Sequence, residues 1–338
     1  MSERSFFFTP EAAKKLYEQG LEGAYYSPKD RNDLTQWLIQ TGGSVTAYDA
    51  CLSGGIAQSG EGKLSLGYMA AMTLYPEAFP GGAQERGDCV SWSTRNAVLG
   101  SYCNQILYGD NPDRLDAPVV SDVARVNGVI STESFYWWRG HGSEGWTASG
   151  AAKCALEKSG MWLRQKYDQF GFDLTKYDVN LAGKWGSSKP PKEIEEFGQQ
   201  RLVKTATFID EWEELRDLIH NGHCVSSAGM EAWGGVRDQW GVCYRKTGTW
   251  AHAIAMMAVD DRPDTVKKYG CGLVLMQNSW GEGYLSGPRA INGTPYSIPP
   301  GSFWAKWSDV RNREMVAFSA VNGWRGMKMP GWGTEGII

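Results

Sequence analysis

The sequence predicts an α+β protein, with helices concentrated in the first half of the chain and strands in the second. From Cys89 onward, apolar residues recur at three- and four-residue steps, which is the period of a buried amphipathic helix. After Gly222 the pattern changes to short runs that are apolar on both faces, which is typical of buried strands. No internal repeat is visible, so the two patterns indicate two segregated lobes with a site expected between them.

Length and composition exclude several classes of protein. The chain has 338 residues, of which 42% are hydrophobic and 21% charged, so it can bury a large core and is neither disordered nor a coiled coil. A net charge of -4 provides no basic field for a polyanion, and we therefore expect no nucleic-acid partner. No apolar stretch approaches the roughly 18 residues of a membrane span, so we also expect no membrane partner.

The first 82 residues read as an N-terminal extension or docking arm. Thr9–Gly20 has a threonine cap, a proline at the first helical position and a closing glycine, which predicts a short helix. A second helix is expected over Asp33–Ile39. Paired glycines between residues 42 and 62 predict a loop-dominated stretch after it.

Residues 83–205 are predicted to form the helical lobe. The first helix begins at Cys89 and ends before Gly109, where the apolar period stops. The second covers Thr147–Ser159, whose small alanine side chains permit close approach to a neighbouring backbone.

Residues 206–322 are predicted to form the β-rich lobe, followed by a glycine-rich tail over 323–338. A helix opens this lobe with Asp210 and Glu213 as a capping box and ends at Gly222. The expected strands are Cys224–Met230, Trp250–Val259, Leu273–Asn278 and Phe303–Trp307, with a surface loop from Ser286 to Gly301.

Cys89 stands directly after a glycine turn and at the start of its helix. The positive end of the helix dipole stabilises a thiolate at that place, whereas the neighbouring carboxylate of Asp88 would raise the pKa of the thiol. A single cysteine is more often a buried structural residue than a nucleophile. Its meaning therefore depends on the other residues of the site.

Two further polar residues lie in or beside apolar strands. His252 stands in the middle of an apolar run, where an imidazole has lost water and needs a partner or a use. Asn278 follows at a strand end, where its amide is able to orient an imidazole. Taken alone, each has an ordinary reading: a satisfied core histidine and a turn residue.

Together these residues carry a resemblance. A glutamine, Gln84, precedes a helix-initial Cys89, followed along the chain by His252-Ala253 in an apolar strand and then by Asn278-Ser279-Trp280-Gly281. In this order they resemble the papain-like cysteine peptidases, of a kind seen in bacteria and tailed phages. The similarity extends to Gly142–Trp146 and Gly301–Trp304, and it spans roughly residues 83 to 310.

The resemblance implies a papain-like two-lobed fold, with a helical lobe carrying the cysteine helix and a β-barrel-like lobe carrying His252 and Asn278. It implies a cysteine peptidase or amidase that cleaves peptide or isopeptide bonds through an acyl-enzyme, without a cofactor. In this reading Cys89 attacks, His252 shuttles the proton, Asn278 orients His252, and Gln84 with the Cys89 backbone N–H receives the oxyanion. The implied substrate-binding residues are Gly142, Glu144, Gly145, Trp146 and Trp280.

An alternative of a different class stays open. A papain-like fold retained as a catalytically silent structural or binding module, for example in a phage virion, fits the loop-rich ends of the chain. In that case the N-terminal arm and the C-terminal tail dock onto a larger protein assembly. The seven widely spaced cysteines, together with the lack of a long apolar leader, predict reduced thiols and a cytoplasmic or virion-associated protein that is not classically secreted.

A metal site was the remaining alternative. His220, His223 and Cys224 lie close together in sequence, and all are potential zinc ligands. Gly222 ends the helix between the two histidines, so they do not share a helical face, and the sequence offers no fourth ligand nearby. We therefore predict no metal.

Overall fold

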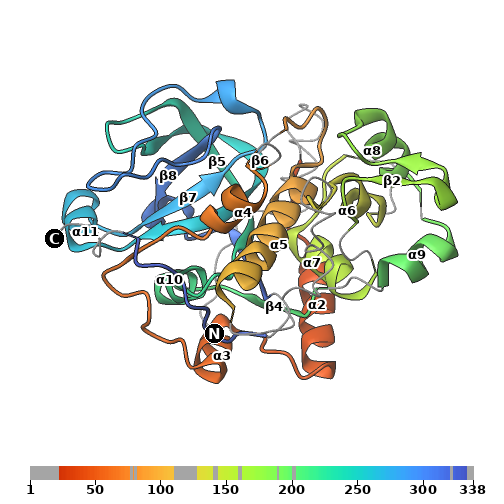
Figure 1. The fold of residues 1–338 in the computed structure, drawn as a ribbon, viewed down its shortest axis with the longest axis horizontal. Helices are drawn as coiled ribbons and strands as arrows, with labels where there is room; N and C mark the ends of the chain where they lie inside the picture. Colours follow the sequence, from red (N-terminus) through yellow and green to blue (C-terminus); the bar gives the residue numbers. More distant parts are fainter. Residues whose placement is uncertain are drawn as a thin grey trace.

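The computed structural model describes residues 23–76, 79, 82–109, 128–139, 144–158, 162–188, 190–199, 203–319 and 323–332. In this part of the chain the fold is α+β, as predicted, with a mainly helical side and, on the other side, a large antiparallel sheet with further helices packed around it (Figure 1). The predicted helix over Thr9–Gly20 lies outside the described residues.

The elements follow in this order along the chain. The helices are α2 (Pro28–Gln40), α3 (Ala47–Gly54), α4 (Met69–Leu74), α5 (Cys89–Tyr108), α6 (Glu133–Trp137), α7 (Ala148–Glu157), α8 (Val179–Gly186), α9 (Lys192–Gln199), α10 (Trp212–His220), α11 (Pro263–Tyr269) and α12 (Trp307–Val310), with short 3-10 turns η3 (Asp168–Phe170) and η4 (Glu282–Tyr284). The strands are β1 (Leu64–Ser65), β2 (Lys166–Tyr167), β3 (Phe172–Asp173), β4 (Thr205–Phe208), β5 (Val225–Arg237), β6 (Cys243–Asp260), β7 (Leu273–Gln277), β8 (Ser302–Lys306) and β9 (Glu314–Ser319).

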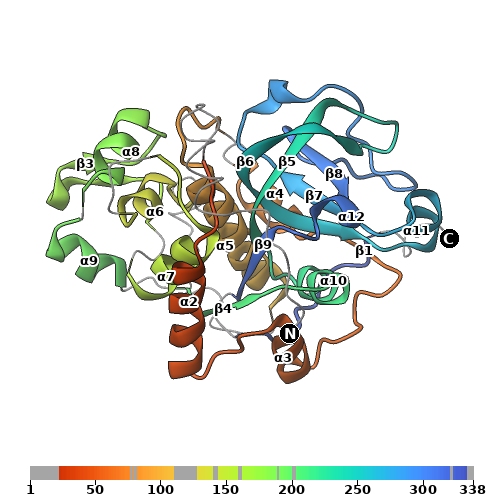
Figure 2. The same ribbon diagram turned by 180° about the vertical axis from the view of Figure 1, so that it is seen from behind.

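The described strands form a seven-stranded sheet and a small hairpin. The sheet has the order β4-β9-β5-β6-β7-β8, and β1 pairs with β6 beside this path. All of these pairings are antiparallel, and β2 pairs with β3 in the separate hairpin. The long β5–β6 ribbon, seen in both views, carries His252 opposite Gly229 (Figure 2). The sheet therefore places the predicted base on a strand with a neighbour on each side.

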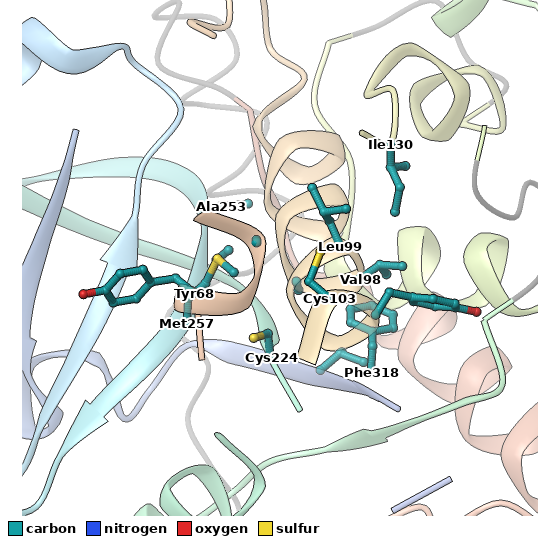
Figure 3. Close-up of a cluster of buried hydrophobic side chains, with 14 of the residues drawn as sticks. Tyr68, Val98, Leu99, Cys103, Ile130, Cys224, Ala253, Met257 and Phe318 are labelled. Carbon is teal, nitrogen blue, oxygen red and sulfur yellow. The ribbon is translucent and has the colours of Figure 1, made fainter. Parts of the chain in front are cut away.

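Helix α5 lies between the helical side and the sheet and is buried over nearly its whole length. Val98, Leu99 and Cys103 point into a cluster that also contains Met257 of β6 (Figure 3). The helix approaches the sheet closely at Gly100, where an added Cβ would lie 2.5 Å from Cε of Met257. Close packing of this kind fixes the helix axis, and with it the position of Cys89 at the first turn.

Helices α7 and α10 both begin at a side-chain cap. Thr147 caps α7 by accepting a hydrogen bond from the backbone N–H of Gly150 at 2.9 Å. The capping box of α10 consists of Glu211 and Glu214, so the prediction of Asp210 and Glu213 was wrong by one residue. Both pairs satisfy the same spacing, and spacing alone does not distinguish them.

The chain before Cys89 contains more secondary structure than predicted. The helix expected over Asp33–Ile39 is present as the longer α2, but the stretch expected to be loop-dominated contains α3. Its N-cap, Thr46, accepts a hydrogen bond from the N–H of Asp49. Further on, β1 pairs with β6, so this part of the chain contributes to the main sheet.

The strand predictions were correct in place, and those for β5 and β6 were too short. The four expected runs correspond to β5, β6, β7 and β8. The prediction missed β4 and β9, which pair with each other, and β9 also pairs with β5.

An aromatic cluster accounts for part of the tryptophan content on the helical side. Trp137 and Trp185 stack with ring centroids 3.8 Å apart, and Trp162 packs edge-on against Tyr167. None of the seven cysteines, all within the described residues, forms a disulfide. In the same part of the chain, no helix combines the length and apolarity that crossing a membrane requires.

Candidate active site

Cys89 is the first residue of α5 and is fully buried. Its Sγ accepts a hydrogen bond from the backbone N–H of Ala253 at 3.3 Å, which ties the helix start to the strand that carries His252. Burial raises the pKa of the thiol to about 12, the Ala253 N–H lowers it, and the charge of Asp88 raises it, as the sequence indicated. In this conformation the thiol is therefore neutral.

Asp88 is itself an unusual group. Its side chain is buried, Oδ2 accepts a hydrogen bond from the Tyr177 hydroxyl at 2.8 Å, and Oδ1 has no partner among the described residues. Burial raises the pKa of this carboxyl to about 7, against the lowering effect of the Tyr177 hydrogen bond. A proton on Asp88 removes a negative charge beside the thiol.

His252 and Asn278 are joined by a hydrogen bond. His252 Nε2 lies 2.8 Å from Asn278 Oδ1, which also accepts the backbone N–H of Ser279 at 2.8 Å. Because Oδ1 accepts from a backbone donor, the shared atom is the amide oxygen, and the neutral imidazole donates through Nε2. The lone pair of the neutral ring is then on Nδ1. Burial lowers the pKa of His252 to about 3, although the Asn278 hydrogen bond raises it.

Trp280 covers this pair. Its ring stacks on the His252 imidazole with centroids 4.3 Å apart and an interplanar angle of 25°. Trp250 and Tyr284 pack against the same indole, at 4.9 and 4.5 Å. The indole therefore shields the His252–Asn278 hydrogen bond from water and holds the ring plane.

A buried ion pair contacts the backbone of His252. Arg313 and Glu231 form an ion pair in which both side chains are buried, and Arg313 Nη2 donates to the His252 carbonyl at 2.6 Å. Arg313 Nε also donates to the hydroxyl of Ser227 at 3.0 Å. These residues were missed at the sequence level. The pair spans 82 positions, and only the packing of β5 beside β9 brings the two together.

The backbone of Gln84 is hydrogen-bonded to the segment that follows Asn278. Its N–H donates to the Ser279 carbonyl at 2.7 Å, and the preceding Ala83 bridges to Trp280. The side-chain oxygen accepts from the Ser279 hydroxyl, while Nε2 donates to the Arg86 carbonyl at 2.8 Å. One N–H of the amide is thus engaged, and the second is the one that an oxyanion would use.

The predicted substrate-binding residues do not all lie in one place. Gly142 lies outside the described residues. Glu144 binds the loop before Cys89: it pairs with Arg86 and accepts from the Tyr136 hydroxyl at 2.6 Å and the Gly87 N–H at 3.1 Å. Trp280 lies on the histidine, as described above.

Gly145 and Trp146 contact the segment Gly23–Tyr26, which we call the strap. The first residue of this segment lies next to the Cys89 thiol. Ala24 forms a parallel bridge with Trp146, and the Tyr25 N–H donates to the Trp146 carbonyl at 2.9 Å. Gly145 adopts a positive φ of 81°, and an added Cβ there would lie 3.5 Å from the Tyr25 ring. No pattern in the sequence indicated this segment.

The histidines considered as metal ligands have other partners. Ser65 Oγ lies 2.8 Å from His220 Nδ1, and His223 Nε2 lies 3.2 Å from the Arg325 carbonyl. Burial lowers the pKa of both to about 4. Within the described residues no group of three or more His, Cys, Asp and Glu side chains is placed to hold a metal ion.

Comparison with known proteins gave structural likeness only. No family model matches the chain, and no curated protein matches it in sequence. Among solved structures it is similar to xylellain, a cysteine protease from Xylella fastidiosa, at 12% identity and a TM-score of 0.44, covering 72% of this chain and 84% of that one. It is similar to procathepsin B S9 from Trypanosoma congolense at 11% identity and a TM-score of 0.48, covering 90% and 88%.

A third likeness is to the cysteine protease and lectin-like domains of Cwp84, a surface layer associated protein of Clostridium difficile. Here the identity is 16% and the TM-score 0.42, and the match covers 75% of this chain and half (50%) of that one. Likenesses this distant say nothing about chemistry, for which the side-chain geometry is the basis.

Proposed function

We propose that the protein is a cysteine peptidase or amidase in which Cys89 is the nucleophile, His252 the proton carrier and Asn278 the residue that orients His252. One observation carries the proposal: His252 donates through Nε2 to Asn278, while its strand neighbour Ala253 donates to the Cys89 Sγ. Residues separated by up to 189 positions, from Cys89 to Asn278, thereby converge at the first turn of a helix.

The acylation step follows from these positions. The Cys89 thiol gives its proton to His252 Nδ1, and Sγ forms a bond to the carbonyl carbon of the scissile amide. The negative charge that develops on the carbonyl oxygen is stabilised by the Cys89 backbone N–H at the helix start and by the Gln84 amide. The C–N bond then breaks as His252 protonates the leaving amine, and a thioester to Cys89 remains.

Deacylation reverses the roles of the same groups. Water gives a proton to His252 Nδ1 and adds to the thioester carbonyl; the C–S bond then breaks, and the Cys89 sulfur recovers its proton from His252. Asn278 holds the ring in one orientation through both steps because its oxygen accepts from Nε2 throughout. No cofactor is needed for this chemistry.

The silent structural or binding module remains the second candidate, and one observation favours it. The Cys89 side chain is 0% exposed, and burial keeps both the thiol and the imidazole neutral. A site that never opens has no activity. In that candidate, residues 1–82 and 323–338 serve to dock the chain to a protein assembly.

Thiol alkylation separates the two candidates. Because Gly23 lies on the thiol, the protein is first cut at a protease site introduced between Tyr26 and Ser27. Iodoacetamide is then added at pH 6, and labelling of each cysteine is followed by peptide mass spectrometry. An activated Cys89 reacts faster than the partly exposed Cys271 of the same molecule, and His252→Ala removes the difference.

The matched control replaces His220, a histidine outside the site, by alanine. An enzyme keeps fast labelling in the control and hydrolyses a peptide library, with new amino termini as the readout. Labelling of Cys89 no faster than of Cys271 after the cut, with or without His252, would establish the silent module instead.

A further inference from the structure

We infer that Glu144 is a positioning residue for the oxyanion donor Gln84: acting through Arg86, it fixes the turn that orients the Gln84 amide. This inference rests on the proposed function and adds a residue that the reaction needs, although that residue acts only through others. The resemblance implied that Glu144 binds substrate, and the contacts of its carboxylate favour this different role.

The Glu144 carboxylate is engaged within the protein on both oxygens. Oε1 pairs with Arg86 Nη2, and Oε2 accepts from the Tyr136 hydroxyl at 2.6 Å and from the Gly87 N–H at 3.1 Å. Arg86 Nε lies 3.4 Å from the same Oε2. A carboxylate has about four acceptor sites, and these four donors occupy them.

The carboxylate carries its charge in this setting. Burial tends to raise the pKa of Glu144, but the hydrogen bonds from Arg86 and Tyr136 outweigh it and hold the pKa below the ordinary value of a glutamate. Hydrogen bonds to an ionised acceptor are stronger than those between neutral groups. The charged Glu144 therefore holds Arg86 and Gly87 firmly.

The Arg86 side chain is fixed from a second side as well. Its Nη1 donates to the carbonyl of Val179, the first residue of α8, at 3.1 Å. The guanidinium also lies against Gly183 of the same helix, where an added Cβ would collide with Nη1. Arg86 is thus held between Glu144 and α8.

The Arg86 carbonyl links this arrangement to the oxyanion donor. It accepts a hydrogen bond from Gln84 Nε2 at 2.8 Å and another from the Asp88 N–H at 2.8 Å. The two N–H bonds of a primary amide lie in one plane at a fixed angle. The partner of the first N–H therefore determines the direction of the second, which is the one available to an oxyanion.

The turn between Gln84 and Cys89 has little room to shift. A Cβ added to Gly87 would lie 2.9 Å from Glu144 Oε2 and 3.0 Å from the Glu144 Cβ. Preorganised donors stabilise an oxyanion only where they already point at its position, and a misplacement of about 1 Å costs about 10²-fold in rate. Glu144→Gln puts an N–H₂ group among donors, so it is expected to loosen the turn.

The test is a double-mutant cycle in the protein cut behind the strap, at the protease site introduced after Tyr26. Peptide hydrolysis gives kcat and KM for the wild type, Glu144→Gln, Gln84→Ala and the double variant. Glu144→Gln is expected to lower kcat at least about tenfold, with KM changed less than about twofold. In the Gln84→Ala background the same substitution is expected to lower kcat less than about twofold, because the amide it positions is absent.

A second readout separates positioning from general damage to the site. Alkylation of Cys89 by iodoacetamide displaces iodide and forms no oxyanion, so Glu144→Gln is expected to leave its rate unchanged. Cys103 is buried in the core and stays unlabelled while the protein is folded. If Glu144→Gln exposes Cys103, Arg86→Met, which breaks the same ion pair, takes its place in the cycle.

The matched control is Asp217→Asn. Asp217 also pairs with an arginine, Arg216, and accepts backbone N–H groups of a loop, from Gln58 at 2.6 Å and from Gly60 at 3.0 Å. That loop carries none of the residues of the proposed mechanism. Asp217→Asn is therefore expected to keep the kcat of the wild type.

The outcomes distinguish this inference from the proposed function. A loss of kcat by the same factor with and without Gln84, or no loss at all, overturns the positioning role while the wild type still hydrolyses peptides. A loss of kcat together with an equal loss in the alkylation rate also overturns it, since the thiol itself is then affected. If the cut wild type hydrolyses no peptide, the proposed function fails, and this inference fails with it.

Discussion

His252 Nε2 and Asn278 Oδ1 lie 2.8 Å apart, under the indole of Trp280. The hydrogen bond decides which nitrogen of the imidazole remains for the thiol, because the Asn278 oxygen accepts from Nε2 and leaves the lone pair on Nδ1. During the reaction the ring becomes an imidazolium, and a hydrogen bond to a charged group is stronger than one to a neutral group. Asn278 therefore supports the charged form of His252.

Asn278→Ala is expected to lower kcat/KM of the cut enzyme about 10- to 100-fold, since a hydrogen bond to a charged partner contributes roughly 1.5–3 kcal/mol. Peptide hydrolysis under single-turnover conditions measures this effect. Asn180→Ala, at an outer position of α8, is the control and leaves the rate unchanged. Equal rates in wild type and Asn278→Ala would remove Asn278 from the mechanism.

Gln84 offers a second test of the site. Gln84→Ala removes a proposed oxyanion donor and is expected to reduce kcat of the cut enzyme about 10²- to 10³-fold, with little change in KM. Ser279→Ala removes only the hydroxyl that holds the Gln84 oxygen, so its expected loss is below about tenfold. If Gln84→Ala is no slower than Ser279→Ala, the Gln84 amide donates nothing to the oxyanion.

Breaking the buried ion pair of Arg313 and Glu231 is expected to lower the stability of the fold. Glu231→Gln leaves the buried Arg313 charge without its partner, and we expect the free energy of unfolding to fall by about 3–5 kcal/mol. Urea denaturation measures it. The control breaks the surface pair of Lys29 and Asp33, where Lys29 is 80% exposed, and Lys29→Met is expected to change the free energy of unfolding far less than Glu231→Gln does. A loss in Glu231→Gln no larger than that in the control would contradict the assignment of a buried pair.

Some local elements of this fold were readable from the sequence, because they depend on nearby residues. The helix from Cys89 to Tyr108 was predicted from its apolar period and its closing glycine. His252 and Asn278 were found because a polar residue in or beside an apolar strand stands out. The capping box was misplaced by one residue because neighbouring glutamates satisfy the same spacing.

What the sequence did not reveal depends on contacts between distant segments. Arg313 and Glu231 are ordinary charged residues until β5 and β9 pair. Gly23 is one glycine among 42, and only its approach to Cys89 distinguishes it. The neutral state of the thiol has the same origin, because burial is a property of the assembled cleft.

Two buried carboxyls with raised pKa values, Asp88 and Glu314, lead to a prediction of how stability changes with pH. Burial raises the pKa of Asp88 to about 7, and it raises the pKa of Glu314 to about 7 although Ser149 donates to that carboxylate. Both native values lie above the unfolded ones. The native state therefore holds protons that the unfolded chain has released, and this contribution to stability is present at low pH and is lost as the pH rises toward 7. The buried histidines, whose native pKa values are lowered, act in the opposite direction below their unfolded value.

Comparing variants with the wild type cancels the histidine contribution. Asp88→Asn keeps an acceptor for Tyr177 and removes the titration, so its stability relative to wild type is expected to increase by about 2–3 kcal/mol between pH 5 and pH 8, at 1.36 kcal/mol per pKa unit. Glu314→Gln is expected to show the same trend. Urea denaturation at both pH values measures it, with the exposed Glu193→Gln on α9 as the control. A difference between Asp88→Asn and wild type that does not change with pH would mean that Asp88 is charged in the native state throughout this range.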